Sequence, residues 1–93
     1  MKAEIYETSV WLAETKPDVL KQKINQVLNH IGFRCLNFVE EYFEPQGYTA
    51  IWLLAESHLA LHSFPEENRT YLQLSCCNQE KYHLFEQIIV GYF

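Results

Sequence analysis

The sequence predicts an α+β fold, a two-layer sandwich in which a mainly antiparallel β-sheet carries two helices on one face. Three observations lead to this class. One segment in the first half has apolar residues at helical spacing, and two segments in the second half alternate between apolar and polar residues. The resulting order of elements, β-α-β-β-β-β-α, places four strands in succession, as antiparallel sheets do.

Length and charge narrow the classes of protein to which the chain can belong. Its 93 residues are enough for one compact domain and not for two, so we expect a single domain over residues 1–93. Seven Lys and Arg stand against twelve Asp and Glu, a formal charge of −5, and no basic run is present. We therefore expect no nucleic-acid partner. The longest apolar runs are too short to span a bilayer, so we expect no membrane partner either.

The cysteines indicate a reducing compartment. Cys35, Cys76 and Cys77 make an odd count without a C-x-x-C pair, and no signal peptide precedes them. Disulfide frameworks are typical of oxidising compartments, so we expect a cytoplasmic protein.

The first half of the chain predicts a strand followed by a helix. Residues 4–13 are rich in β-branched and aromatic side chains and predict the first strand. Thr15 is expected to cap the helix, with Pro17 in its first turn, and Gly32 is expected to end it in a left-handed conformation. The apolar stripe of this helix consists of Leu20, Ile24, Val27, Leu28 and Ile31.

A run of strands follows the helix. Residues 33–43 predict a second strand, and residues 44–47, with Pro45 and Gly47, predict a turn. Residues 48–54 are almost wholly apolar, which is typical of a central strand covered on both faces.

Two alternating strands and a helix complete the chain. In residues 58–64 and 70–77 the leucines point to one face, and residues 65–69 form a polar turn between the two strands. Asn78 is expected to cap a last helix, which has apolar residues at helical spacing. These residues are Tyr82, Phe85 and Ile89. We expect both helices to cover the leucine face of the sheet.

The opposite face of these two strands carries His62 and Cys77. If the strands are hairpin neighbours, the two side chains are expected to approach each other. By residue type alone, His62 suits an interfacial histidine and Cys77 a small buried thiol, and Cys35 is expected to be a buried hydrophobic residue. A metal site of His58, His62 and Cys77 is the alternative, but it lacks a further ligand and the spacing of a structural zinc site.

A longer motif extends across this region. Residues 56–66 read ESHLALHSFPE, and Cys77 follows His62 by fifteen positions. An upstream pattern, F-x-P-x-G followed by a hydroxyl residue, is met by Phe43, Pro45, Gly47 and Thr49. The ungapped segment 43–77 therefore resembles the S-adenosylmethionine decarboxylase proenzymes of the small bacterial and archaeal type. The hallmark of that family has the form E-S-H-hydrophobic-x-hydrophobic-H-S/T-aromatic-P-E.

The resemblance implies that the chain cuts itself and makes its own cofactor. Ser57 would attack the carbonyl of Glu56 and convert the amide to an ester, and elimination would then release residues 1–56. Ser57 would become a pyruvoyl group at the head of residues 57–93, with the release of ammonia. The pyruvoyl carbonyl would form a Schiff base with a substrate amine and act as the electron sink for loss of carbon dioxide, so no metal is expected.

The resemblance also implies roles for five other residues. His62 would transfer protons during processing, and Thr49 would supply a hydroxyl group nearby. Cys77 would protonate the carbanion left by carbon dioxide loss. Phe43 would stack on adenine and Glu66 would accept from ribose hydroxyls, although Phe43 alone also suits the core and Glu66 a solvated turn. The substrate would be S-adenosylmethionine, for polyamine (spermidine) synthesis, and the enzyme would be a homodimer with sites near the interface.

Departures from the family pattern keep two other functions open. Asn78 replaces the usual glycine after the cysteine, and residues 67–69 replace a glycine-aromatic turn. These changes affect the nucleoside pocket, so a pyruvoyl-dependent decarboxylase of ornithine or arginine is one alternative. The other is an unprocessed, non-catalytic homologue that binds a partner or a nucleoside.

Overall fold

The computed structural model describes residues 3–93, which form a five-stranded β-sheet, two α-helices and one short 3₁₀-helix. The elements are β1 (Tyr6–Leu12), α1 (Pro17–Ile31), β2 (Cys35–Tyr42), β3 (Tyr48–Leu54), β4 (Ser57–Phe64), η1 (Pro65–Glu67), β5 (Arg69–Cys76) and α2 (Gln79–Tyr92). The order of strands and α-helices is the predicted one, and their bounds lie within a few residues of those expected.

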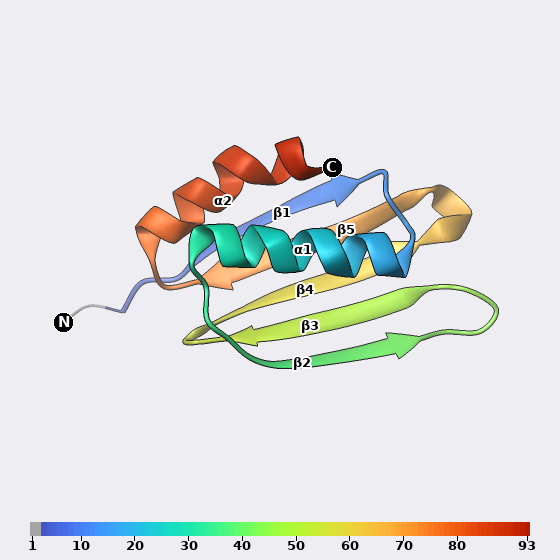
Figure 1. The fold of residues 1–93 in the computed structure, drawn as a ribbon, viewed down its shortest axis with the longest axis horizontal. Coiled ribbons are helices and arrows are strands. Elements are labelled where there is room, and N and C mark those ends of the chain that lie inside the picture. Colours follow the sequence, from blue (N-terminus) through green and yellow to red (C-terminus); the bar gives the residue numbers. More distant parts are fainter. Residues whose placement is uncertain (1–2) are drawn as a thin grey trace.

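Strand order and helix placement confirm the α+β sandwich. The sheet runs β1-β5-β4-β3-β2, and every neighbouring pair is antiparallel. The two edge strands, β1 and β2, are joined through α1, which crosses one face of the sheet (Figure 1). The second helix, α2, lies on the same face and contacts α1, β1 and β5. Both helices therefore cover the leucine face, as expected.

The first helix has a buried apolar stripe and two defined ends. The residues of the predicted stripe are all buried: Leu20, Ile24, Val27, Leu28 and Ile31. Gly32 ends the helix at a φ of 94°, and its N–H donates to the Leu28 carbonyl. The predicted cap at Thr15 is wrong, because Lys16 is the N-cap residue and makes no side-chain cap bond. Instead, the Glu14 carboxylate accepts from the backbone N–H groups of Thr15 and Lys16, each at 3.1 Å.

The second helix is fixed by its cap and by its apolar side. As predicted, the Asn78 side chain accepts from the Lys81 backbone N–H, at 2.9 Å. Phe85 and Ile89 are buried against the sheet, and the half-buried Tyr82 packs beside them. Within residues 3–93, no helix is long and apolar enough to cross a membrane.

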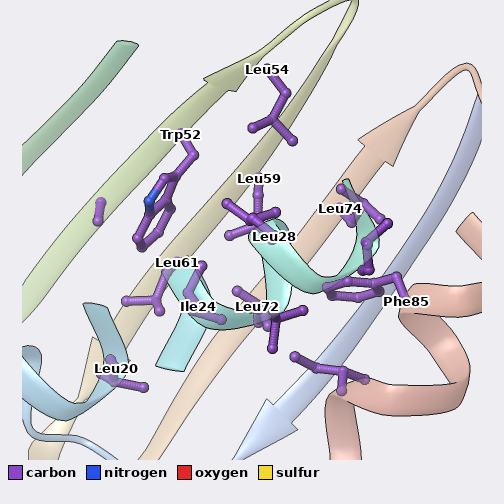
Figure 2. Close-up of a cluster of buried hydrophobic side chains, with 14 of the residues drawn as sticks. Leu20, Ile24, Leu28, Trp52, Leu54, Leu59, Leu61, Leu72, Leu74 and Phe85 are labelled. Atoms are coloured by element: carbon purple, nitrogen blue, oxygen red, sulfur yellow. The ribbon is translucent and has the colours of Figure 1, made fainter. Parts of the chain in front are cut away.

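The core lies between the helices and the inner face of the sheet, and Figure 2 shows its centre. The inner side chains of β3, β4 and β5 that are at most 1% exposed include Trp52, Leu54, Leu59, Leu61, Leu72 and Leu74. Full burial of one leucine side chain contributes roughly 1.5–3 kcal/mol, so this layer is a main source of stability. The Trp52 indole N–H donates to Asn25 Oδ1 at 2.9 Å, which leaves no unpaired donor on this buried ring.

Neither helix covers the outer face of the sheet. The prediction that residues 48–54 are covered on both faces is wrong, because Ile51 and Leu53 are 39% and 49% exposed. Val39, on the neighbouring strand β2, is 63% exposed. Both helices lie on the inner face, so within residues 3–93 no helix packs against these side chains. Exposed apolar groups of this kind are typical of a surface that binds another molecule.

Gly32→Ala is expected to lower the free energy of unfolding by about 1 kcal/mol, because alanine disfavours a left-handed φ. No atom lies within 4 Å of the position of the added Cβ, so the backbone conformation alone accounts for the loss. Chemical denaturation followed by circular dichroism measures the change.

Gly91→Ala is the matched control for this prediction. Gly91 also has open space around it but lies within α2 without a positive φ, so alanine should raise stability by up to ~1 kcal/mol. If Gly32→Ala is as stable as the wild type, the left-handed helix stop is wrong.

Candidate active site

The residues of the sequence motif lie at two opposite ends of the sheet. The hairpin end, where the β3–β4 hairpin meets the last residues of β5, holds Glu56, Ser57 and Cys77. The loop end, where the β2–β3 loop meets η1, holds Phe43, Thr49, His62 and Glu66. In Figure 1 the hairpin end is on the left and the loop end on the right.

A tight turn positions Ser57 at the hairpin end. Leu54 pairs with Ser57 across the hairpin, so only Ala55 and Glu56 form the turn. Glu56 has a φ of 58°, and among the described non-glycine residues only Asn68 shares a positive value. This left-handed conformation costs roughly 1–2 kcal/mol for a residue with a side chain. Strain therefore lies on the residue whose carbonyl forms the peptide bond to Ser57.

Cys77 faces this turn from the position directly after β5. The ladder of β4 and β5 ends with the pair His58 and Ser75, and the chain beyond each residue brings Cys77 close to Glu56. The Cys77 S–H donates to Glu56 Oε2 at 3.4 Å, and both residues are exposed. The hairpin end thus combines a thiol, a carboxylate and the hydroxyl group of a serine.

The loop end contains a hydrogen-bonded threonine and histidine. Thr49 on β3 lies opposite His62 on β4, and Thr49 Oγ1 is 3.0 Å from His62 Nδ1. Both residues are half-buried and form part of the wall of a pocket of about 280 Å³. The pocket is lined by Phe43, Gln46, Gly47, Thr49, His62, Ser63, Phe64 and Glu66.

Two loops bring Phe43 and Glu66 to this pocket. Phe43 is 50% exposed, so it is not a core residue. Gly47, at a φ of 117°, lets the chain turn back so that the Phe43 N–H donates to the Gly47 carbonyl at 2.9 Å. Glu66 Oε2 accepts from the Gln46 side-chain amide at 3.3 Å, which ties the two loops together. The pocket therefore combines an aromatic ring, a carboxylate, an imidazole and a hydroxyl group.

A hydrogen-bond network on the inner face holds β3 behind the pocket. The Tyr48 hydroxyl donates to Glu40 Oε1 at 2.8 Å, and Lys21 Nζ lies 2.9 Å from the same oxygen. The hydrogen bonds from Lys21 and Tyr48 lower the pKa of Glu40, and burial beside this carboxylate raises the pKa of Tyr48. Since Tyr48 directly precedes Thr49, the network fixes the strand that carries the threonine.

The two ends are far apart within one chain, which corrects another prediction. His62 pairs with Tyr71, six residues before Cys77, so His62 and Cys77 are about 20 Å apart at the usual rise of a strand. On the same basis, Ser57 and His62 are separated by about 17 Å. The alternative metal site is not formed either: within residues 3–93, no group of three His, Cys, Asp or Glu residues could hold a metal ion.

Comparison with known proteins relates this arrangement to one family. The family model for S-adenosylmethionine decarboxylase matches residues 3–93. The chain belongs to this family. Similar proteins include the S-adenosylmethionine decarboxylase proenzymes of Prochlorococcus marinus (strain MIT 9313), 36% identical over 61 residues, and Archaeoglobus fulgidus, 31% identical over 75 residues. These matches cover 66% and 81% of this chain but 49% and 66% of the relatives, so the chain spans about half the length of the first.

A solved structure shares the fold. The crystal structure of the adenosylmethionine decarboxylase from Aquifex aeolicus has a TM-score of 0.79 to this chain and 17% sequence identity. The match covers 99% of this chain and 82% of that protein. The family implied by the motif and the fold predicted from the order of elements are both confirmed.

Three pocket residues of this decarboxylase-family chain have no role predicted from the sequence: Gln46, Ser63 and Phe64. Gln46 occupies a variable position of the F-x-P-x-G pattern, so nothing in that pattern marks it. Ser63 does carry a signal, because strand alternation places it on the leucine face, where a hydroxyl group needs a partner. Within the described part of the chain, Ser63 Oγ is the one buried side-chain oxygen or nitrogen without a hydrogen-bond partner.

The three cysteines are expected to react at different rates with a chromogenic thiol reagent. Cys76 is fully buried, and burial raises its pKa, whereas Cys77 is exposed. Cys35 is also exposed, so the prediction of a buried Cys35 is wrong; it begins the edge strand β2, away from the helices. A native titration should therefore show two fast thiols and one slow one.

Single substitutions assign these phases to residues. Cys77→Ser should remove one fast phase, and Cys76→Ser should remove the slow phase. Loss of the slow phase in Cys77→Ser would show that the two neighbouring thiols point the opposite way from the structure.

Proposed function

We propose that the chain is the precursor of a self-processing, pyruvoyl-dependent decarboxylase that acts on S-adenosylmethionine. The observation that carries this proposal is the left-handed Glu56 directly before Ser57, with the Cys77 thiol against it. Ornithine and arginine lack a nucleoside, so a pocket that combines Phe43 with Glu66 favours S-adenosylmethionine over either amino acid.

Ser57 is the nucleophile in the processing reaction. Its Oγ attacks the Glu56 carbonyl carbon and displaces the amide nitrogen, which forms an ester. Elimination then releases the Glu56 carboxylate and leaves dehydroalanine, and hydrolysis yields ammonia and a ketone. Backbone strain at Glu56 supports the reaction, because a cut directly after this residue frees it to leave its disfavoured conformation. His62 of a second copy moves the protons, because within one chain His62 is too far from Ser57, and its ring is oriented by the hydrogen bond with Thr49.

The surroundings of Ser57 fit a pyruvoyl group. Ser57 is half-buried at the start of β4, so a group at this position is held by the strand and remains open to substrate. The ketone would supply the electron sink for decarboxylation of an amine substrate. Cys77 lies at the same end of the sheet, where its thiol can deliver a proton.

A second copy of the chain would unite the two ends of the sheet. If the outer faces of two sheets pack together about a two-fold axis perpendicular to the strands, the hairpin end of one copy lies over the loop end of the other. The same contact would cover the exposed side chains of Val39, Ile51 and Leu53. Each site would then combine Ser57 and Cys77 from one copy with His62, Thr49, Phe43 and Glu66 from the other.

We place the enzyme in the cytoplasm, in the service of polyamine synthesis. All three cysteines of the chain are free, which suits a reducing compartment. Decarboxylation of S-adenosylmethionine yields a donor of aminopropyl groups, the building blocks of spermidine.

Wild-type protein is expected to contain two chains, residues 1–56 and 57–93, in intact mass spectrometry under denaturing conditions. The second chain should react with a carbonyl-trapping reagent, because a ketone replaces its amino terminus. Ser57→Ala should remain one chain, because it lacks the attacking oxygen. Ser9→Ala, at an exposed serine of β1, is the control and should be cut like the wild type.

A wild type that stays whole for days after folding would contradict self-processing and favour the non-catalytic homologue. For cut protein, release of carbon dioxide from S-adenosylmethionine, ornithine and arginine in parallel assays identifies the substrate.

A mixture of two inactive variants is expected to recover activity if each site draws on two copies. When Ser57→Ala and His62→Ala are unfolded and refolded together, one site in each mixed dimer has both residues, so about a quarter of wild-type activity should return. Carbon dioxide release measures the recovery.

A second mixture controls for this result. Ser57→Ala and Cys77→Ala both alter the hairpin end, so no mixed dimer has an intact site and no activity should return. If the first mixture also stays inactive although both variants fold and dimerise, the two-fold arrangement is wrong.

A further inference from the structure

We propose that Glu56 has a second role besides supplying the carbonyl that is cut: its side chain positions the Cys77 thiol for proton delivery. This inference rests on the proposed function, because Cys77 acts as an acid only there. Glu56 would be the last residue of the first fragment after the cut, and its carboxylate would keep its place beside the thiol.

The contact with Glu56 distinguishes Cys77 from its neighbour. The Cys77 S–H, directly after β5, donates to Glu56 Oε2 in the β3–β4 turn at 3.4 Å. The Cys76 S–H instead donates to the Asn78 carbonyl, at 3.5 Å, and Cys76 is fully buried. Of these two adjacent thiols, only Cys77 is both exposed to a substrate and held by a charged acceptor.

The turn at residue 56 gives no conformational reason for a glutamate. A φ of 58° favours glycine or asparagine, and Asn68 occupies the other positive-φ position, at 56°. Within residues 3–93, the Glu56 side chain makes one hydrogen bond, which it accepts from the Cys77 thiol. A role for the carboxylate at the thiol accounts for a residue that the backbone disfavours.

A carboxylate beside the thiol helps it act as an acid, because the hydrogen bond fixes the direction of the S–H bond that must give up its proton. The cut leaves this side chain on the last residue of the first fragment, so the contact can persist in the active enzyme.

The first test reads the contact in a chain that is not cut. In a Ser57→Ala, Cys35→Ser background, Cys77 is the remaining exposed thiol, and iodoacetamide alkylation followed by mass spectrometry gives its rate. Glu56→Gln is expected to raise this rate several-fold at neutral pH, because the thiol is then no longer held against a carboxylate. Glu80→Gln, which neutralises an exposed carboxylate in the first turn of α2, should leave the rate unchanged. Equal rates in the two variants overturn the proposal.

The second test measures turnover in the cut enzyme. Glu56→Gln is expected to lower kcat by roughly tenfold with KM unchanged, after rates are divided by the fraction of cut chains. Glu56→Asp keeps the charge and should restore part of this loss. If kcat per cut chain is unchanged in Glu56→Gln, the positioning role of Glu56 is wrong and the proposed function still stands. If the wild type is neither cut nor active, the proposed function fails instead, and the alkylation rates still decide whether Glu56 holds the thiol.

Discussion

The antiparallel register of β4 with its two neighbours is the constraint on which both ends of the site depend. Register with β3 places Thr49 opposite His62, and register with β5 brings Cys77 to Glu56. A slip of one residue would turn every side chain of β4 to the other face and expose its buried leucines, at roughly 1.5–3 kcal/mol each. Packing of leucines on the inner face therefore determines where the polar side chains lie on the outer face.

The fold was largely predictable from the sequence, because its patterns repeat over whole elements. The helical stripe that ends at Gly32 and the alternation in β4 and β5 each involve many residues, so a single exception does not obscure them. Prediction of the first cap failed because it depends on one hydrogen bond. The Glu14 carboxylate accepts from the N–H groups of Thr15 and Lys16 instead, and residue types alone do not show which side chain reaches these groups.

The sequence motif marks candidate site residues but does not show how they are arranged. Alternation places His62 and Cys77 on the same face, but it does not say how far apart they lie along the strands, and the register puts them at opposite ends. The motif likewise marks Ser57 but not the left-handed Glu56 before it. Apolar residues such as Ile51 indicate burial but do not show which surface covers them. In this structure neither helix covers Ile51.

In the sheet order β1-β5-β4-β3-β2, strands from both sides of the Glu56–Ser57 bond are interleaved. After a cut there, β4 and β5 of the second fragment would remain clasped between β3 and β1 of the first. Separation of the fragments would break the hydrogen bonds between β1 and β5 and between β3 and β4, and it would expose the buried leucines to water. The two fragments of the cut protein should therefore stay associated without a covalent link. Once denatured, however, it could recover only by an encounter of two molecules, whose success depends on concentration. The cut would thus create a reactive end group but remove the ability of the protein to refold as a single chain. Folding would therefore have to come before cutting, and the cut could not be reversed.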